Sequence, residues 1–234
     1  MRLTVLGKYG PYPKENGGCS SYLVEDGDTK LLLDMGCGAY SRLHRHIDPL
    51  SLDAVIITHY HYDHCSDLGI LQYAHQIANS GGLSVFSPPP DGLYKVDSPF
   101  KQEDVSEGAR VKIGGVTAEF HRVLHPVASV CVRLTGASGR SLFYTGDTRW
   151  MDELVEYAEG ADVLLADTGL LFPIPNLPAQ PHLTAAEVGK LVKQARVGRL
   201  ICTHISPLAD ERELLDEVNF DGAVVAEEGM SYEV

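Results

Sequence analysis

Four potential metal ligands stand within a stretch of six residues, directly after a short apolar segment. The segment is Asp53–Thr58, and the ligands that follow it are His59, His61, Asp63 and His64. A compact apolar run of this kind is typical of a strand buried on both faces. Three imidazoles and a carboxylate beside the core would bury much uncompensated polarity without a metal ion. Because these donor groups suit zinc, manganese or iron, we predict a metal site at the end of the strand.

A single loop cannot surround a pair of metal ions, so further donors should come from other parts of the chain. Three candidates each follow a segment with the pattern of a strand, namely His125, Asp147 and His204. Proteins that alternate helices and strands place their sites at the carboxyl ends of the strands, where these three residues are expected. Gly146 permits a sharp turn that would present the carboxylate of Asp147.

The remaining periodicity predicts strands first, and then helices that alternate with strands. The earlier strands are expected at Leu3–Leu6, Ser20–Val24, Lys30–Leu33, Leu83–Phe86, Val111–Ile113, Val116–Leu124, Val130–Thr135 and Ser141–Thr145. The later strands are expected at Val163–Ala166 and Leu200–Thr203, and the helices at Asp67–Asn79, Asp152–Ala158, Thr184–Ala195 and Leu208–Val218. Gly81-Gly82 would cap the first helix, and Thr184 with Glu187 has the spacing of a capping box. Because no linker interrupts this pattern, we predict a single α/β domain over residues 1–234.

Composition and charge limit the classes of partner. Hydrophobic residues make up 44% and charged residues 22% of the 234 residues, as in soluble globular proteins. The formal net charge of −13 repels polyanions, so a general nucleic-acid binder is disfavoured. Five scattered cysteines without CxxC spacing favour a reducing compartment, and no apolar run reaches membrane-spanning length. We therefore expect a cytoplasmic protein that does not contact a membrane, and a homodimer stays open.

The motif order HxHxDH, isolated histidine, Gly-Asp and final histidine resembles that of the metallo-β-lactamase superfamily. The resemblance extends from Leu31–Asp34 to His204, nearly the whole chain. It implies a four-layer αββα sandwich, an α/β (α+β) fold, with two divalent metal ions between the sheets. Zn²⁺ is favoured, and Mn²⁺ and Fe²⁺ are alternatives. The implied ligands are His59, His61 and His125 for the first ion, Asp63, His64 and His204 for the second, and Asp147 as the bridge. Asp34 would orient a ligand from behind.

A second part of the sequence indicates a subfamily within this superfamily. His182-Leu183-Thr184-Ala185-Ala186-Glu187, followed by Leu200–Pro207, resembles ribonuclease Z and the small phosphodiesterases related to it. In those enzymes the corresponding histidine lies beside the scissile phosphate and pairs with a glutamate. Asp167 stands at the matching position here, and because an aspartate is shorter, the pairing stays open. No long, basic, glycine-rich insert of the kind that grips tRNA is present, so the chain is most similar to the compact members that lack this arm.

Two metal ions roughly 3.5–4 Å apart lower the pKa of a bridging water toward about 7 and hold both oxygens of a displacement. We expect such a hydroxide, held near Asp147, to hydrolyse small phosphodiesters such as cyclic nucleotides. His182, steadied by Asp167, would stabilise the developing charge or protonate the leaving oxygen. The expected catalytic residues are therefore His182, Asp63 and Asp167. The loop Lys8–Cys19 is predicted to overhang the site and to influence substrate choice.

Other functions stay open at this stage. Thioester or lactone hydrolases of the glyoxalase II type share HxHxDH and a Gly-Asp-Thr turn, although Leu124-His125-Pro126 departs from their Gly-His-Thr order. A β-lactamase is less favoured because many of them use a cysteine at the second metal, and a redox di-iron protein usually has an acidic residue at the position of His61. A carrier or accessory protein that binds metal without turnover is the non-enzymatic alternative.

Overall fold

The computed structural model describes residues 1–90 and 96–234, and in these ranges the strands form two seven-stranded sheets. The first sheet has the order β14 (Ser231–Glu233), β1 (Arg2–Gly7), β2 (Ser21–Asp26), β3 (Thr29–Met35), β4 (Ala54–Ile56), β5 (Ser84–Ser87) and β6 (Lys101–Asp104). The second sheet has the order β13 (Val224–Val225), β12 (Arg199–Thr203), β11 (Val163–Asp167), β10 (Ser141–Tyr144), β9 (Val130–Thr135), β8 (Val116–Arg122) and β7 (Arg110–Ile113).

Each sheet is half antiparallel and half parallel. Strand β1 pairs antiparallel with β14 and β2, whereas β3, β4, β5 and β6 run parallel. In the second sheet β7 to β10 are antiparallel, and β10 to β13 are parallel. The carboxyl ends of parallel strands meet at one edge of a sheet. The candidate site residues His59, Asp147 and His204 follow strands at this edge.

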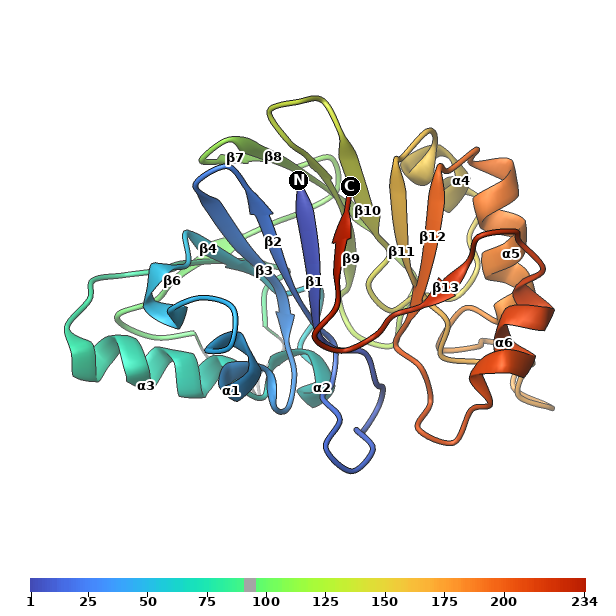
Figure 1. Ribbon diagram of the computed structural model, residues 1–234, viewed down its shortest axis with the longest axis horizontal. Coiled ribbons are helices and arrows are strands. Elements are labelled where there is room, and N and C mark those ends of the chain that lie inside the picture. The colour runs from blue at the N-terminus through green and yellow to red at the C-terminus, as the bar shows by residue number, and fades with distance from the viewer. Residues whose placement is uncertain (91–95) are drawn as a thin grey trace.

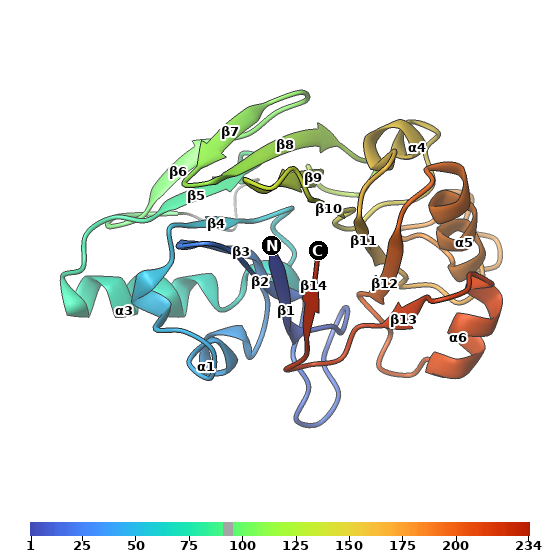
Figure 2. The ribbon, with the colours of Figure 1, turned by 45° about the horizontal axis from the view of Figure 1, so that its top comes forward.

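Helices cover the outer face of both sheets. Figures 1 and 2 show α4 (Glu153–Ala158), α5 (Ala185–Gln194) and α6 (Glu211–Val218) outside β11 and β12. The helices α1 (Ala39–Leu43), α2 (Tyr62–Cys65) and α3 (Leu68–Ala78) lie along the first sheet (Figure 1), and a short 3₁₀ helix spans Pro49–Ser51. None of the helices in the described ranges has the length and apolarity that crossing a membrane requires.

Three apolar layers hold the four layers of backbone together. Alternation along β3 illustrates the rule, because side chains of a strand point to opposite faces in turn. Leu31 and Leu33 pack into the core between the sheets, whereas Leu32 packs among the side chains of the first helical layer. The second helical layer has its own core, which includes Leu164 and Leu191. The predicted αββα sandwich is therefore confirmed.

One of the two predicted helix caps is present in the structure, and the other is not. The capping box of α5 is present, because Glu187 accepts from the backbone N–H of Thr184 at 2.9 Å and donates its own backbone N–H to the Thr184 hydroxyl. The predicted cap at Gly81-Gly82 is wrong. The helix α3 instead ends at Asn79, which adopts the left-handed conformation with φ of 50°.

Other differences concern short elements. The segment after β4 was expected as a turn, but Tyr62–Cys65 forms the helix α2. Strand β6 has the polar sequence KQED, which lacks the alternation of apolar residues by which a strand is predicted. Its parallel pairing with β5 is seen only in the folded structure. The last predicted helix begins at Glu211 rather than Leu208, because Asp210 caps its first turn by accepting from the backbone N–H groups of Arg212 and Glu213.

Candidate metal centre

The residues expected to carry chemistry gather at one edge of the two sheets. His59 follows β4, Asp147 follows β10, and His204 follows β12. Three overlapping groups have ligand atoms within 4.8 Å of one another: His59, His61, His125 and Asp147; Asp63, His64, Asp147 and His204; and Asp147, Asp167, His182 and His204. The structure thus brings together every sequence-predicted ligand and catalytic residue, and Asp147 belongs to all three groups.

Three imidazoles form the first group. The Nδ1 atom of His61 lies 3.0 Å from Nε2 of His59 and 3.0 Å from Nε2 of His125. The Oδ2 atom of Asp147 lies 3.6 Å from Nε2 of His59 and 3.9 Å from that of His125. Ring nitrogens that converge in this way can surround a cation, and the donor set of three histidines and one carboxylate suits Zn²⁺.

The second group contacts the same oxygen of Asp147 as the first group. The Oδ2 atom of Asp147 is 3.2 Å from Nε2 of His64 and 3.3 Å from Nε2 of His204. Asp63 closes the group, with Oδ2 at 3.1 Å from Nε2 of His204 and 3.6 Å from Nε2 of His64. One carboxylate is therefore within reach of both groups, as the bridging role predicted for Asp147 requires.

Unpartnered buried atoms test whether these residues fit metal ions. Nε2 of His64 and Oδ1 of Asp147 are both buried, and neither makes a hydrogen bond with the described part of the chain. Leaving a buried polar atom unpaired is costly, so such atoms are rare unless an ion or ligand satisfies them. Both atoms belong to the second group, which therefore fits a divalent cation. The converging ring nitrogens of the first group fit another.

Asp34 orients His64 of the second group through the ring nitrogen that faces away from the cluster. Its Oδ2 atom lies 2.8 Å from Nδ1 of His64 and accepts from the Tyr144 hydroxyl at 2.8 Å, while Oδ1 accepts from the backbone N–H of Thr58 at 2.7 Å. Because His64 gives Nδ1–H to this carboxylate, its Nε2 lone pair is left for a metal ion. The orienting role predicted for Asp34 is consistent with this geometry.

The ring of His125 is oriented by a different partner. Its Nδ1 atom lies 3.0 Å from the carbonyl oxygen of Pro181, in the proline-rich loop before α5. This contact directs Nε2 toward His61. The sequence gives no signal for this contact, because the acceptor is a backbone carbonyl group, which every residue carries.

Loop 8–19 packs directly on the second group. The backbone N–H of Ile205 donates to the Lys8 carbonyl at 2.8 Å, and that of Gly10 donates to the Ile205 carbonyl at 3.2 Å. A Cβ atom at Gly10 would overlap the imidazole of His204, whose own backbone is left-handed with φ of 53°. Loop 8–19 therefore lies beside the site, and its influence on substrate choice stays a prediction. The requirement for glycine at position 10 is a feature that sequence analysis missed.

His182 and Asp167 form the pair that the sequence left open. The Nδ1 atom of His182 lies 3.0 Å from Oδ2 of Asp167, and the same carboxylate lies 3.4 Å from Nδ1 of His204. Backbone N–H groups of Thr148 and Gly169 also donate to Asp167, at 3.2 and 2.9 Å. A shorter carboxylate suffices here, because β11 pairs Asp167 with Thr203, the residue before His204, and so places the carboxylate at this edge of the sheet.

The histidines of the site fall into two classes, those with a lowered pKa and those with a raised pKa. Burial lowers the pKa of His59 well below its usual range and that of His125 to about 4, so these imidazoles are neutral and ready to bind metal. Burial would also lower the pKa of His204, but Asp147, Asp167 and Asp63 outweigh it and raise this pKa to about 10. His64 behaves likewise, because Asp147 and Asp34 overcome burial and raise its pKa well above the usual range.

Comparison with known proteins connects this geometry to a family. The profile of the metallo-beta-lactamase superfamily matches residues 15–204. A protein of Bacillus subtilis named probable metallo-hydrolase YhfI is 30% identical over 248 aligned residues that cover 100% of both chains. The crystal structure of YhfI superposes with a TM-score of 0.91 and covers 99% of each chain.

More distant structures have the same fold. The short form of human tRNase Z gives a TM-score of 0.78 at 18% identity, covering 100% of this chain and 99% of the other. A diphosphatase of the PhnP family gives a TM-score of 0.79 at 18% identity, covering 100% and 97%. The layers and their connections are therefore common to all three.

Proposed function

Because the chain belongs to the metallo-β-lactamase superfamily of metallo-hydrolases, we propose that it hydrolyses small phosphodiesters, with cyclic nucleotides as the favoured substrates. The observation that carries this proposal is the pairing of His182 with Asp167 beside Asp147, at 3.0 Å between Nδ1 and Oδ2. This pair provides an acid next to the ligand cluster, where a leaving oxygen needs a proton.

The ligand assignment follows the two groups that share Asp147. One divalent ion would be held by His59, His61 and His125, and the other by Asp63, His64 and His204, with Asp147 between them. Zn²⁺ is the favoured ion, because nitrogen donors dominate the first group. When bound, the two ions supply Lewis acidity that activates water and offsets the charge of a phosphate.

His182 acts on the substrate through its outer ring nitrogen. Nδ1 is engaged by Asp167, so Nε2 is the nitrogen available to a substrate, and it makes no hydrogen bond with the described residues. The ring is half-buried and stacks on that of His204 with 4.8 Å between centroids. In this position a proton held at Nε2 passes to the leaving alkoxide, while Asp167 stabilises the imidazolium.

The charge of the chain limits substrate size. With a net charge of −13, the surface repels a long polyanion, whereas a small anion needs only to reach the cluster. Two proteins that share the fold are named a tRNase and a diphosphatase, and both names denote phosphate chemistry. The compact chain and its acidic surface favour the small substrates of this chemistry.

A panel of substrates tests the proposal. Metal content is measured first, and the loaded protein is then assayed with a bis-aryl phosphodiester, 2′,3′-cyclic nucleotides, a glutathione thioester and a lactone. We expect turnover of the phosphodiesters. A preference for the thioester or lactone overturns the substrate class, and absence of all turnover in fully loaded protein indicates a metal-binding carrier.

A further inference from the structure

A cavity of about 300 Å³ opens next to the second ligand group. It borders Asp63, and its walls come from three separate parts of the chain. Loop 8–19 contributes Pro11, Tyr12 and Pro13, the segment after β3 contributes Cys37, and the start of α2 contributes Tyr62. Because Asp63 belongs both to the cavity wall and to the second ligand group, the two sites are adjacent.

Both tyrosines expose rings that the fold does not use. Tyr12 is 52% exposed and Tyr62 is 68% exposed, and Tyr62 directly precedes the buried residues Asp63 and His64. Tyr62 lies between His61 and Asp63 in the sequence, so its position is set by two residues of the ligand cluster. Large aromatic surfaces that line a cavity beside a polar site are typical of places where a ligand ring stacks.

The charges around the cavity exclude a phosphate as its occupant. No lysine or arginine lines it among the described residues, and its charged groups are the carboxylates of Asp63 and Asp67. Asp63 is turned toward His204, and Asp67 accepts from the backbone N–H of Tyr40 at 3.0 Å. An anion would be repelled here, so the cavity suits an uncharged planar group.

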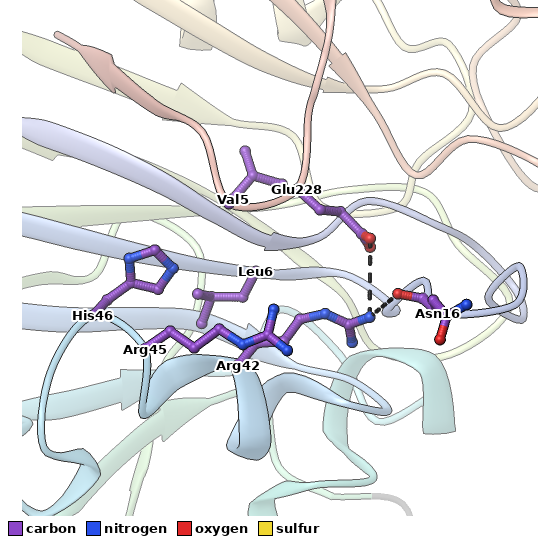
Figure 3. A pocket seen from close by; sticks show the side chains of 8 residues that line it. Val5, Leu6, Asn16, Arg42, Arg45, His46 and Glu228 are labelled. Atoms are coloured by element: carbon purple, nitrogen blue, oxygen red, sulfur yellow. Dashed lines mark hydrogen bonds and ion pairs between the residues drawn. The ribbon is translucent and has the colours of Figure 1, made fainter.

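Loop 8–19 is held in place before any ligand arrives. Figure 3 shows the Arg42 guanidinium between the Asn16 carbonyl and the Glu228 carboxylate, with 3.9 Å between its Nη2 atom and Oε2 of Glu228. The backbone N–H of Gly18 donates to Oε1 of Glu228 at 2.6 Å. These anchors secure the end of the loop opposite to Gly10. The segment that carries Tyr12 is therefore anchored at both ends, through Gly10 and through Asn16 and Gly18, and such anchoring lowers the entropic cost of ordering the loop on binding.

We propose that this cavity binds the nucleobase of the substrate, with Tyr12 and Tyr62 as the stacking residues. This inference rests on the proposed function, since the phosphodiester of the same molecule would lie at the ligand cluster. Asp63 belongs to both regions, so the sugar would lie beside this residue. The two tyrosines then determine which phosphodiesters bind well, whereas the ligand cluster and His182 determine how fast they react.

Binding of two product analogues tests the proposal without turnover. Calorimetry compares adenosine 5′-monophosphate with ribose 5-phosphate on the metal-loaded protein. Stacking of one base on aromatic side chains should make the nucleotide bind about 5- to 150-fold more tightly. Tyr12→Ala with Tyr62→Ala should remove this advantage and leave the affinity for ribose 5-phosphate unchanged. Tyr12→Phe with Tyr62→Phe should retain it, because stacking needs the ring alone.

Tyr73→Ala is the matched control, because Tyr73 lies on α3 outside the cavity and is 64% exposed. It should keep the full advantage of the nucleotide. Equal binding of the two analogues by the unaltered protein overturns the inference, as does an advantage that survives in the double alanine variant. Tyrosine-dependent binding in a protein that hydrolyses no phosphodiester supports the subsite and rejects the proposed reaction. Hydrolysis without preference for the base rejects the subsite alone.

Discussion

Nδ1 of His182 lies 3.0 Å from Oδ2 of Asp167, at the edge where β11 ends beside β12. The carboxylate is fully buried and the imidazole is half-buried, so one partner is fixed and the other is open to the cluster. The pair also lies close to Asp147, with 3.7 Å between Nδ1 of His182 and Oδ2 of Asp147. This geometry is the basis for the proposed division between metal ligands and a residue that transfers a proton.

His182→Ala should leave both metal ions bound and lower kcat by about 10²–10⁴-fold, the usual range for loss of a general acid. Steady-state rates and metal content are measured on the same preparation. His121→Ala is the control, because His121 lies on β8 outside the three ligand groups. A variant that keeps its rate would reduce His182 to a structural role.

Asp147→Ala should lose metal and activity together. All three ligand groups include this carboxylate, and its removal takes away the one carboxylate that His64 and His204 share with the first group. Elemental analysis should find fewer than two ions per chain, and the rate should fall with the metal content. Full metal occupancy in this variant would contradict the bridging assignment.

Gly10→Ala should weaken the second metal position selectively. The added methyl group would overlap the His204 ring, so the ring must rotate away from Asp63 and Asp147. Loss of orientation of this kind lowers metal affinity by about 10–100-fold. A competition titration with a chelator should show one weak and one unchanged ion.

Gly115→Ala provides the glycine control, because the nearest atom to its added Cβ is 3.6 Å away, an ordinary contact. It should bind both ions like the unaltered protein. If the two glycine variants bind metal equally well, the contact between loop 8–19 and His204 has no role in the site.

Asp34→Asn should also lower metal affinity by about 10–100-fold. The carboxylate accepts from His64 and Tyr144, and an amide group can satisfy these donors only through its single oxygen. The expected consequence is a His64 ring that no longer directs Nε2 at the cluster. Titration of the metal-free variant checks this, with Asp53→Asn at an exposed site as the control.

Metal binding should release protons near neutral pH. In the metal-free protein the pKa of His204 is raised to about 10 and that of His64 is also raised, so both rings carry protons at pH 7. Their charged forms stabilise the metal-free fold fully below the ordinary histidine pKa of about 6.5, and this contribution is lost as pH rises through about 10. A metal ion must displace these protons, so its apparent affinity should increase with pH.

Calorimetric titration in buffers of different ionisation enthalpy measures this release. The heat of metal binding should change with the buffer, and the slope should indicate between one and two protons at pH 7. A heat independent of the buffer would mean that both rings are already neutral.

The extent of sequence-based prediction differs between parts of the site. His59, His61, Asp63 and His64 could be found because a local spacing encodes them, and His125, Asp147 and His204 because each follows an apolar run. The short strand β6 and the cap of α3 were missed, since the first depends on pairing with β5 and the second on the backbone conformation of Asn79. Neither property leaves a pattern in the order of residue types.

The sequence alone determines the types of ligand, their order along the chain and the resemblance to a family, because each of these is recognised from short local motifs. The contacts that make the ligands a centre depend on packing across the two sheets. Asp63 and His204 are 141 positions apart, yet their ligand atoms lie 3.1 Å from each other. The reach of Asp167 to His182, the close approach of Gly10 to His204, and the tyrosine-lined cavity arise in the same way. They are set by the distance between strand ends, which only the folded arrangement of the layers determines.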